Sequence, residues 1–173
     1  MSPALHAFRA KHSLAPAKIM LTFGAVEVPR YSWRFTSWSG IPLKDTYGGK
    51  AAVDSEGSPV FVELAMIRVL RARGFDWAVW VDNYHQCFRD AMPPAVCALP
   101  TQARAIYERI VTINGSRRGC WDLLAWNREG VSFVECKRKG KDHMTLSQVK
   151  WLESALKAGL RLEDFGICEW VIE

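Results

Sequence analysis

Acidic and basic side chains lie close together in the segment 131–137, which has the composition of a strand. Because side chains alternate between the two faces of a strand, Glu135 and Lys137 project from the same face. Asp122 lies at the start of the preceding apolar segment, and the turn residues 127–130 between the two segments predict a hairpin. In a hairpin the start of the first strand lies beside the end of the second, so we expect Asp122 to lie near Glu135 and Lys137.

Two carboxylates that meet at one end of a hairpin can bind a hard divalent cation such as Mg²⁺ or Mn²⁺. A lysine beside them can orient an attacking water molecule or stabilise negative charge on a phosphate. Asp122, Glu135 and Lys137 are therefore candidates for metal-dependent chemistry on a phosphate. The alternative is a structural ion pair between Lys137 and a carboxylate at the edge of a sheet.

A third carboxylate, Glu63, lies in a helix that we predict to start at Ser58-Pro59, because serine caps helices and proline fits the first helical position. Gly74 is expected to end this helix. Glu63 falls on the apolar stripe of the helix, where a buried charge needs a partner, either a metal site or an arginine. The alternative is that the stripe is wide and that Glu63 lies at its edge.

Gln148 has two interpretations. Thr145–Gln148 has the pattern of a capping box, in which the glutamine side chain satisfies a free backbone amide at the start of a helix. This helix start also follows closely after Lys137, so the same side chain could face the carboxylates. The sequence leaves both interpretations open.

Positive charge is concentrated in one part of the chain. The formal net charge is +5; residues 101–150 contain ten lysines and arginines against five aspartates and glutamates, whereas the remainder contains thirteen of each. A localised basic excess favours an anionic partner, nucleic acid first, and the alternative is a solvated basic surface. The candidate phosphate contacts are Arg117, Arg118, Arg138, Lys139 and Lys141.

Composition and length limit the class of protein. The 173 residues suit one ordinary domain, and 49% hydrophobic with 24% charged residues is usual for globular proteins and excludes a disordered chain. No apolar run is long enough to span a bilayer and the start lacks a signal-peptide core, so we expect a cytoplasmic protein with no membrane partner. Five widely spaced cysteines without a CxxC pair predict neither a disulfide framework nor a structural zinc site.

The remaining pattern predicts an α/β core. Residues 1–57 have weak periodicity and are expected to form an N-terminal extension that packs on the domain 58–173, because they contain two tryptophans. After the first helix, the predicted elements are a strand at 77–81, an irregular stretch at 82–100, a helix capped by Thr101 at 101–111, strands at 121–126 and 131–137, a helix at 145–158 and a strand at 166–172.

Three segments together resemble the PD-(D/E)xK nuclease superfamily, and within it the VRR-NUC group related to Holliday-junction resolvases. They are the glycine, aspartate and apolar strand of Gly119–Trp126, the Glu-x-Lys strand Val131–Lys137, and the Ser-Gln helix start of Thr145–Gln148 with its stop at Gly159. The resemblance covers roughly residues 58–173. One departure is Trp121, where the family usually has proline.

The resemblance implies a restriction-endonuclease-like αβββαβ core with a mixed sheet flanked by helices. It implies that Asp122, Glu135, Glu63 and a backbone carbonyl near Cys136 bind Mg²⁺ or Mn²⁺, with Lys137 as the catalytic lysine and Gln148 as the glutamine of the second core helix. The implied activity is metal-dependent hydrolysis of DNA phosphodiester bonds in structured or branched DNA, with a homodimer as one arrangement. The alternative is a nucleic-acid-binding or scaffold protein that keeps the nuclease fold without cleavage.

Overall fold

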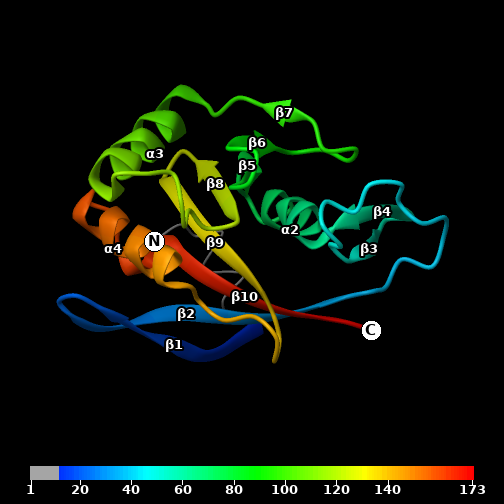
Figure 1. Ribbon diagram of the computed structural model, residues 1–173, viewed down its shortest axis with the longest axis horizontal. Coiled ribbons are helices and arrows are strands. Elements are labelled where there is room, and N and C mark those ends of the chain that lie inside the picture. The colour runs from blue at the N-terminus through cyan, green and yellow to red at the C-terminus, as the bar shows by residue number, and fades with distance from the viewer. Residues whose placement is uncertain (1–11) are drawn as a thin grey trace.

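The computed structural model describes residues 12–173; the first eleven residues of the expected N-terminal extension lie outside the described part. The described residues form an eight-stranded sheet, a two-stranded sheet and three α-helices (Figure 1). In chain order the elements are β1 (Ser13–Leu21), β2 (Gly24–Phe35), β3 (Ala52–Ser55), β4 (Ser58–Phe61), α2 (Val62–Arg71), β5 (Trp77–Asp82), β6 (Cys87–Arg89), β7 (Val96–Cys97), α3 (Thr101–Asn114), β8 (Leu123–Asn127), β9 (Gly130–Arg138), α4 (Leu146–Lys157), the 3₁₀ turn η1 (Leu162–Asp164) and β10 (Phe165–Ile172).

The large sheet is mixed, as the resemblance implies. Its strand order is β1-β2-β10-β9-β8-β5-β6-β7. β10 runs parallel to both β2 and β9, and the other neighbouring pairs are antiparallel. The fold class is therefore mixed α/β.

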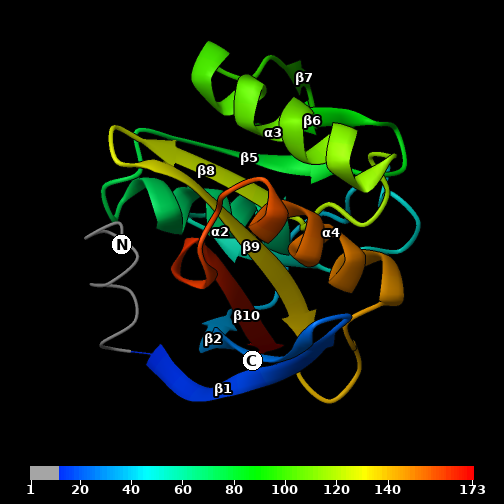
Figure 2. The same ribbon diagram turned by 90° about the vertical axis from the view of Figure 1, so that its left-hand side faces the viewer.

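Helices cover both faces of this sheet. α3 and α4 lie together on one side of it, and α2 lies on the other (Figures 1 and 2). Two clusters of buried side chains fill the two layers, one around α2 and one around α3 and α4. β9 is buried continuously from Val131 to Cys136, as expected for a strand covered on both faces.

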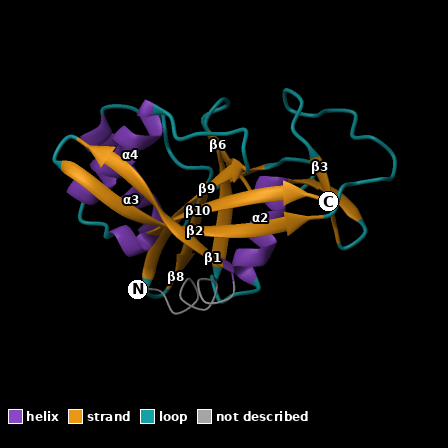
Figure 3. Cartoon of the chain, turned by 90° about the horizontal axis from the view of Figure 1, so that it is seen from below, coloured by secondary structure: helices purple, strands orange, loops and turns teal. Residues whose placement is uncertain are grey.

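The N-terminal segment contributes strands to the same sheet. β1 and β2 form an antiparallel hairpin, and β2 pairs in parallel with β10, so the three strands run side by side (Figure 3). The chain then leaves the sheet through the loop 36–51 and enters the small β3–β4 hairpin, which packs beside α2. The sequence contains no clear strand period at 13–35, and these strands were not expected.

Ser58-Pro59 starts a strand, and the predicted helix start there is wrong. Asp54 pairs with Pro59 in the β3–β4 hairpin, whose tight turn places Glu56 and Gly57 at positive φ. The fixed φ of proline suits an extended strand in a short hairpin as well as a helical first turn. α2 therefore begins three residues later than proline, at Val62, and ends at Arg71.

Two further expectations need correction. The stretch 82–100 contains the short strands β6 and β7, which extend the sheet at one edge. Pro100 precedes the first turn of α3 and Thr101 lies inside it, and the helix continues to Asn114, where Gly115 ends it with φ 75°. By contrast, the β8–β9 hairpin and the helix capped by Thr145 form as predicted. None of the helices among residues 12–173 is long and apolar enough to cross a membrane.

Candidate active site

The β8–β9 hairpin brings the two predicted carboxylates together. Leu123 pairs with Val134, so Asp122, just before β8, lies beside Glu135 near the end of β9. The Asp122 amide donates to Glu135 Oε2 at 3.2 Å, and the Cys136 amide donates to Asp122 Oδ2 at 2.9 Å. These reciprocal bonds fix both carboxylates against the backbone of the neighbouring strand.

Lys137 and Gln148 complete the arrangement around Glu135. Lys137 Nζ lies 2.8 Å from Glu135 Oε1 and donates to Gln148 Oε1 at 3.0 Å. Gln148 Nε2 donates to the same Glu135 oxygen. Gln148 Oε1 also accepts from the Thr145 amide, at 2.9 Å, so the capping box exists and both interpretations of Gln148 hold. The predicted residues Asp122, Glu135, Lys137 and Gln148 therefore meet.

Gly119 and Trp121 hold the start of α4 against this hairpin. Gly119 has φ 82°, and a Cβ added there would collide with the Ser147 carbonyl oxygen and lie 2.9 Å from the Gln148 amide nitrogen. The indole of Trp121, which is fully buried, donates to the Gln148 carbonyl oxygen at 3.2 Å. Trp121 therefore positions the glutamine through its backbone.

Glu63 approaches these residues from α2, and its ion-pair partner is Lys50, a lysine of the N-terminal segment. Lys50 Nζ forms an ion pair with Glu63 Oε1. The Lys50 ammonium also lies 5.1 Å from the centroid of the Trp80 ring, a cation–π distance. Sequence reasoning expected a metal or an arginine beside Glu63 and missed Lys50, because a loop residue thirteen positions away carries no periodic signal.

The electrostatics of the site follow from three carboxylates and two ammonium groups. Burial, and then the negative charge of Glu63, raise the pKa of Asp122 to about 6. Burial, and then the charge of Asp122, raise the pKa of Glu135 well above its usual value. Burial lowers the pKa of Lys50, but the charges of Glu63 and Asp122 outweigh it and leave that pKa raised. Lys50 therefore stays an ammonium and offsets part of the negative charge.

These groups line one cavity of about 400 Å³. The oxygen donors of Asp122, Glu135 and Glu63 suit a hard divalent cation by their chemistry. Within residues 12–173, however, no group of three or more His, Cys, Asp or Glu side chains is arranged to hold a metal ion. Lys50 and Lys137 instead pair with two of the three carboxylates. Glu63 and Glu135 would therefore each bind a cation beside a lysine that already pairs with one of their two oxygens.

Cys136 enters the site through its backbone. Its thiol belongs to the core cluster around α2, and burial raises the pKa of that thiol well above its usual value. The sulfur therefore stays protonated and is unsuited to binding a hard cation. The backbone carbonyl as a metal ligand stays a prediction.

The predicted basic residues divide into two groups. Arg138 and Lys141 line the cavity, and Lys139 is exposed on the turn between them. Arg117 and Arg118 lie on the loop before β8 and do not line the cavity, and Arg117 pairs with Glu108. The basic turn after β9 is thus the part of the predicted phosphate surface next to the carboxylates.

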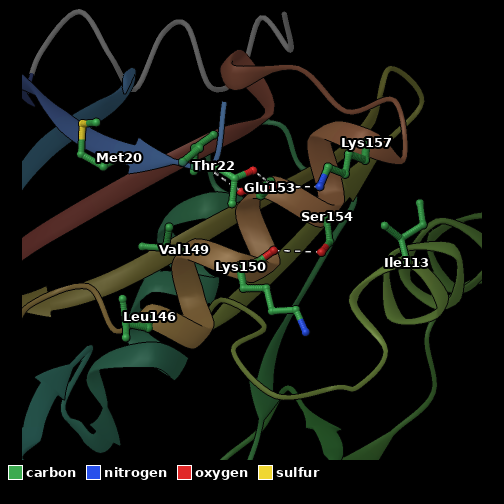
Figure 4. A pocket seen from close by; sticks show the side chains of 10 residues that line it. Met20, Thr22, Ile113, Leu146, Val149, Lys150, Glu153, Ser154 and Lys157 are labelled. Carbon is green, nitrogen blue, oxygen red and sulfur yellow. Dashed lines mark hydrogen bonds and ion pairs between the residues drawn. The ribbon is translucent and has the colours of Figure 1, made fainter. Parts of the chain in front are cut away.

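A different cavity, of about 530 Å³, lies between α4 and the β1–β2 turn (Figure 4). Its carboxylate, Glu153, accepts hydrogen bonds from Thr22 and pairs with Lys157, which ties the N-terminal hairpin to α4. These bonds lower the pKa of Glu153 to about 2. None of the predicted site residues lies there, so this cavity is separate from the candidate active site.

Comparisons of the chain with family models and with curated proteins give no match.

Proposed function

We propose that the chain is a metal-dependent DNA endonuclease that hydrolyses phosphodiester bonds in structured or branched DNA. One observation carries the proposal: Asp122, Glu135, Lys137 and Gln148 meet in a cavity bordered by the basic turn after β9. A lysine fixed beside two carboxylates, with arginine and lysine side chains next to it, suits a phosphate group.

The order of elements supports the restriction-endonuclease-like core as part of this proposal. Leaving aside the insertion between β5 and β8, the chain runs α2, β5, β8, β9, α4, β10, which is the succession αβββαβ. The three strands β5, β8 and β9 form consecutive antiparallel pairs, and β10 joins β9 in parallel. This places Glu63, at the start of α2, and Gln148, at the start of α4, at the same end of the hairpin as Glu135.

Each residue has a role that follows from its contacts. Asp122, Glu135 and Glu63 would hold Mg²⁺ or Mn²⁺, which supplies Lewis-acid activation of the phosphodiester and of water. Glu135 and Gln148 orient the Lys137 ammonium, which can then donate a hydrogen bond to water or to a phosphate oxygen. Arg138 and Lys141 would bind neighbouring phosphates without reading sequence.

The test is cleavage of single-stranded, duplex, flap and four-way DNA in Mg²⁺, in Mn²⁺ and in EDTA. Asp122→Asn and Glu135→Gln should each lower the cleavage rate by about 100-fold or more, because each removes an anionic group from the reacting centre. Lys137→Met should abolish cutting and leave DNA affinity within severalfold. Glu129→Gln is the matched control, since this exposed carboxylate lies at the opposite end of the same hairpin. Full activity in EDTA, or wild-type rates in the carboxylate variants, would contradict the proposal.

The lysine pairs favour a second candidate, a DNA-binding protein that retains the arrangement without cleavage. Lys50 and Lys137 already neutralise Glu63 and Glu135, and the described residues contain no ready group of three metal ligands. The same panel separates the two functions. Salt-sensitive DNA binding without product in either metal would select the second.

A further inference from the structure

A third cavity, of about 430 Å³, adjoins the candidate active site and shares Lys50 with it. Tyr47, Trp80, Tyr84 and His85 contribute rings to its lining, and Lys50 forms part of its wall. Lys50 also lines the cavity that contains Asp122 and Glu135. A chain of phosphates that reaches the carboxylates can therefore continue past Lys50 into an aromatic cavity.

The rings of this cavity are of two kinds. Trp80 is almost fully buried, and Tyr47 packs edge-on against it with ring centroids 6.0 Å apart, so these two build the interior wall. Tyr84 is 89% exposed, and its ring meets His85 edge-on at 4.9 Å between centroids. A large aromatic side chain exposed to this degree beside a cavity is available to stack on a planar group.

His85 is held in place from beneath. Its Nδ1 lies 2.7 Å from Asp82 Oδ2, and its backbone amide donates to Asp82 Oδ1 at 3.1 Å. Arg89 Nε donates to the same Asp82 carboxylate at 2.8 Å, and Asp82 itself is only 3% exposed. The His85 side chain is nonetheless 47% exposed, so a buried ion pair fixes a ring whose outer part faces the cavity. Such fixing lowers the side-chain entropy that His85 would otherwise lose when a ligand packs against it.

We infer that this cavity binds an unpaired nucleobase of the DNA strand whose phosphate lies at the candidate active site, with the exposed Tyr84 ring as the stacking face and His85 edge-on beside it. This inference deepens the proposed function and rests on it. Aromatic side chains stack on any base because every base has a π face, so the cavity selects unpaired structure and not sequence. Lys50, with three donors, can pair with Glu63 and still contact the phosphate that links the two cavities.

The experiment measures binding of the full chain in EDTA to two oligonucleotides of equal length. One is single-stranded with a single 2-aminopurine, and the other is a blunt duplex. Stacking should quench 2-aminopurine fluorescence when the wild type binds. Tyr84→Ala should weaken single-strand binding by about five- to 150-fold and remove the quenching, and should leave duplex affinity within twofold. Tyr84→Phe should retain both, because the ring face is kept.

Phe23→Ala is the matched control, because Phe23 is an aromatic side chain 60% exposed on the β1–β2 turn and lines neither cavity. Unchanged single-strand affinity in Tyr84→Ala, or an equal loss for the duplex, would overturn the inference. The measurement needs no cleavage, so a failure of this inference can be told apart from a failure of the nuclease proposal. If the wild type cuts DNA and Tyr84→Ala binds single strands normally, only the inference of base binding is rejected. If 2-aminopurine is quenched but no metal supports cleavage, only the nuclease proposal is rejected.

Discussion

Gln148 serves the helix and the candidate site at once. Its Oε1 accepts from the Thr145 amide at the start of α4 and from the Lys137 ammonium, and its Nε2 donates to Glu135. A capping box fixes the side chain relative to the helix axis, so the same bond that stabilises the helix end also orients the lysine. One side-chain amide therefore both stabilises the start of α4 and orients the lysine of the candidate site.

Lys50 has the corresponding role for the acidic side of the cavity. It pairs with Glu63, lies over Trp80 and is close enough to Asp122 for its charge to affect the pKa of that carboxyl. Its side chain is 32% exposed, so the ion pair is partly screened by solvent. It is the one basic group that the loop 36–51 contributes to the lining of the candidate active site.

We predict that Lys50→Met lowers the free energy of unfolding by about 1–3 kcal/mol at pH 8 in EDTA, because it leaves Glu63 and Asp122 without their nearby cation. The loss should shrink as the pH falls. Asp122 has a pKa of about 6 in the folded chain, above its usual value, so the unfavourable charge is fully present above that pH and disappears as the carboxyl is protonated. Urea unfolding at pH 8 and pH 5 measures the difference.

The double variant Lys50→Met/Glu63→Gln is the control for this prediction. Removing the carboxylate together with its partner should recover much of the stability, since no uncompensated charge then remains at that pair. A loss that is independent of pH, or equal in the single and double variants, would show that Lys50 acts through packing on Trp80 alone.

At the scale of elements, the position of α4 depends on a close approach of two backbones. Gly119 lets the loop before β8 pass directly against the first turn of α4, and Trp121 then bonds to the carbonyl of Gln148. This contact holds the hairpin that carries Asp122 and Glu135 against the helix that carries Gln148.

Gly119→Ala should lower the free energy of unfolding by about 2–4 kcal/mol, because it combines a left-handed φ with a collision against the Ser147 carbonyl. Gly115→Ala is the matched control. Gly115 also has a positive φ, of 75°, but a Cβ there meets nothing within 4 Å, so only the backbone cost of about 1–2 kcal/mol is expected. If chemical denaturation gives the same loss of unfolding free energy for both variants, the loop before β8 can move away from α4 without an energetic cost, which would contradict the prediction.

The features that the sequence predicts well are local. The β8–β9 hairpin follows from two apolar segments around a four-residue turn, and the capped start of α4 follows from Thr145 and Gln148 alone. The helix start predicted at Ser58-Pro59 was wrong because the same two residues also suit a hairpin strand. The pairing of Pro59 with Asp54 selects the strand over the helix. Lys50 was missed for the related reason that its partners are fixed by the tertiary fold. The role of Lys50 could therefore be recognised only from the structure.

At the scale of the whole molecule, positive charge meets the candidate site at one end of the β8–β9 hairpin. Arg138 and Lys141 line the cavity, and Asp142 accepts from the Arg138 amide to close the turn that also exposes Lys139. The opposite end of the hairpin carries Arg128, also exposed. The fold thus places basic side chains both near the carboxylates and far from them. Replacing one group or the other can therefore distinguish direct phosphate contact from a general effect of net charge.

Replacing Arg138, Lys139 and Lys141 with alanine should weaken DNA binding about equally for all sequences and flatten its salt dependence. Each phosphate contact releases counterions, so log K falls with log salt by about 0.9 per contact on duplex DNA, and losing three contacts should reduce the slope by up to about 2.7. The matched control replaces Arg104, Arg109 and Arg128, which removes the same charge from exposed positions away from the cavity. A salt titration should then give a nearly unchanged slope for the control. Equal slopes in the two triple variants would mean that net charge alone attracts DNA, and that the turn after β9 does not face it.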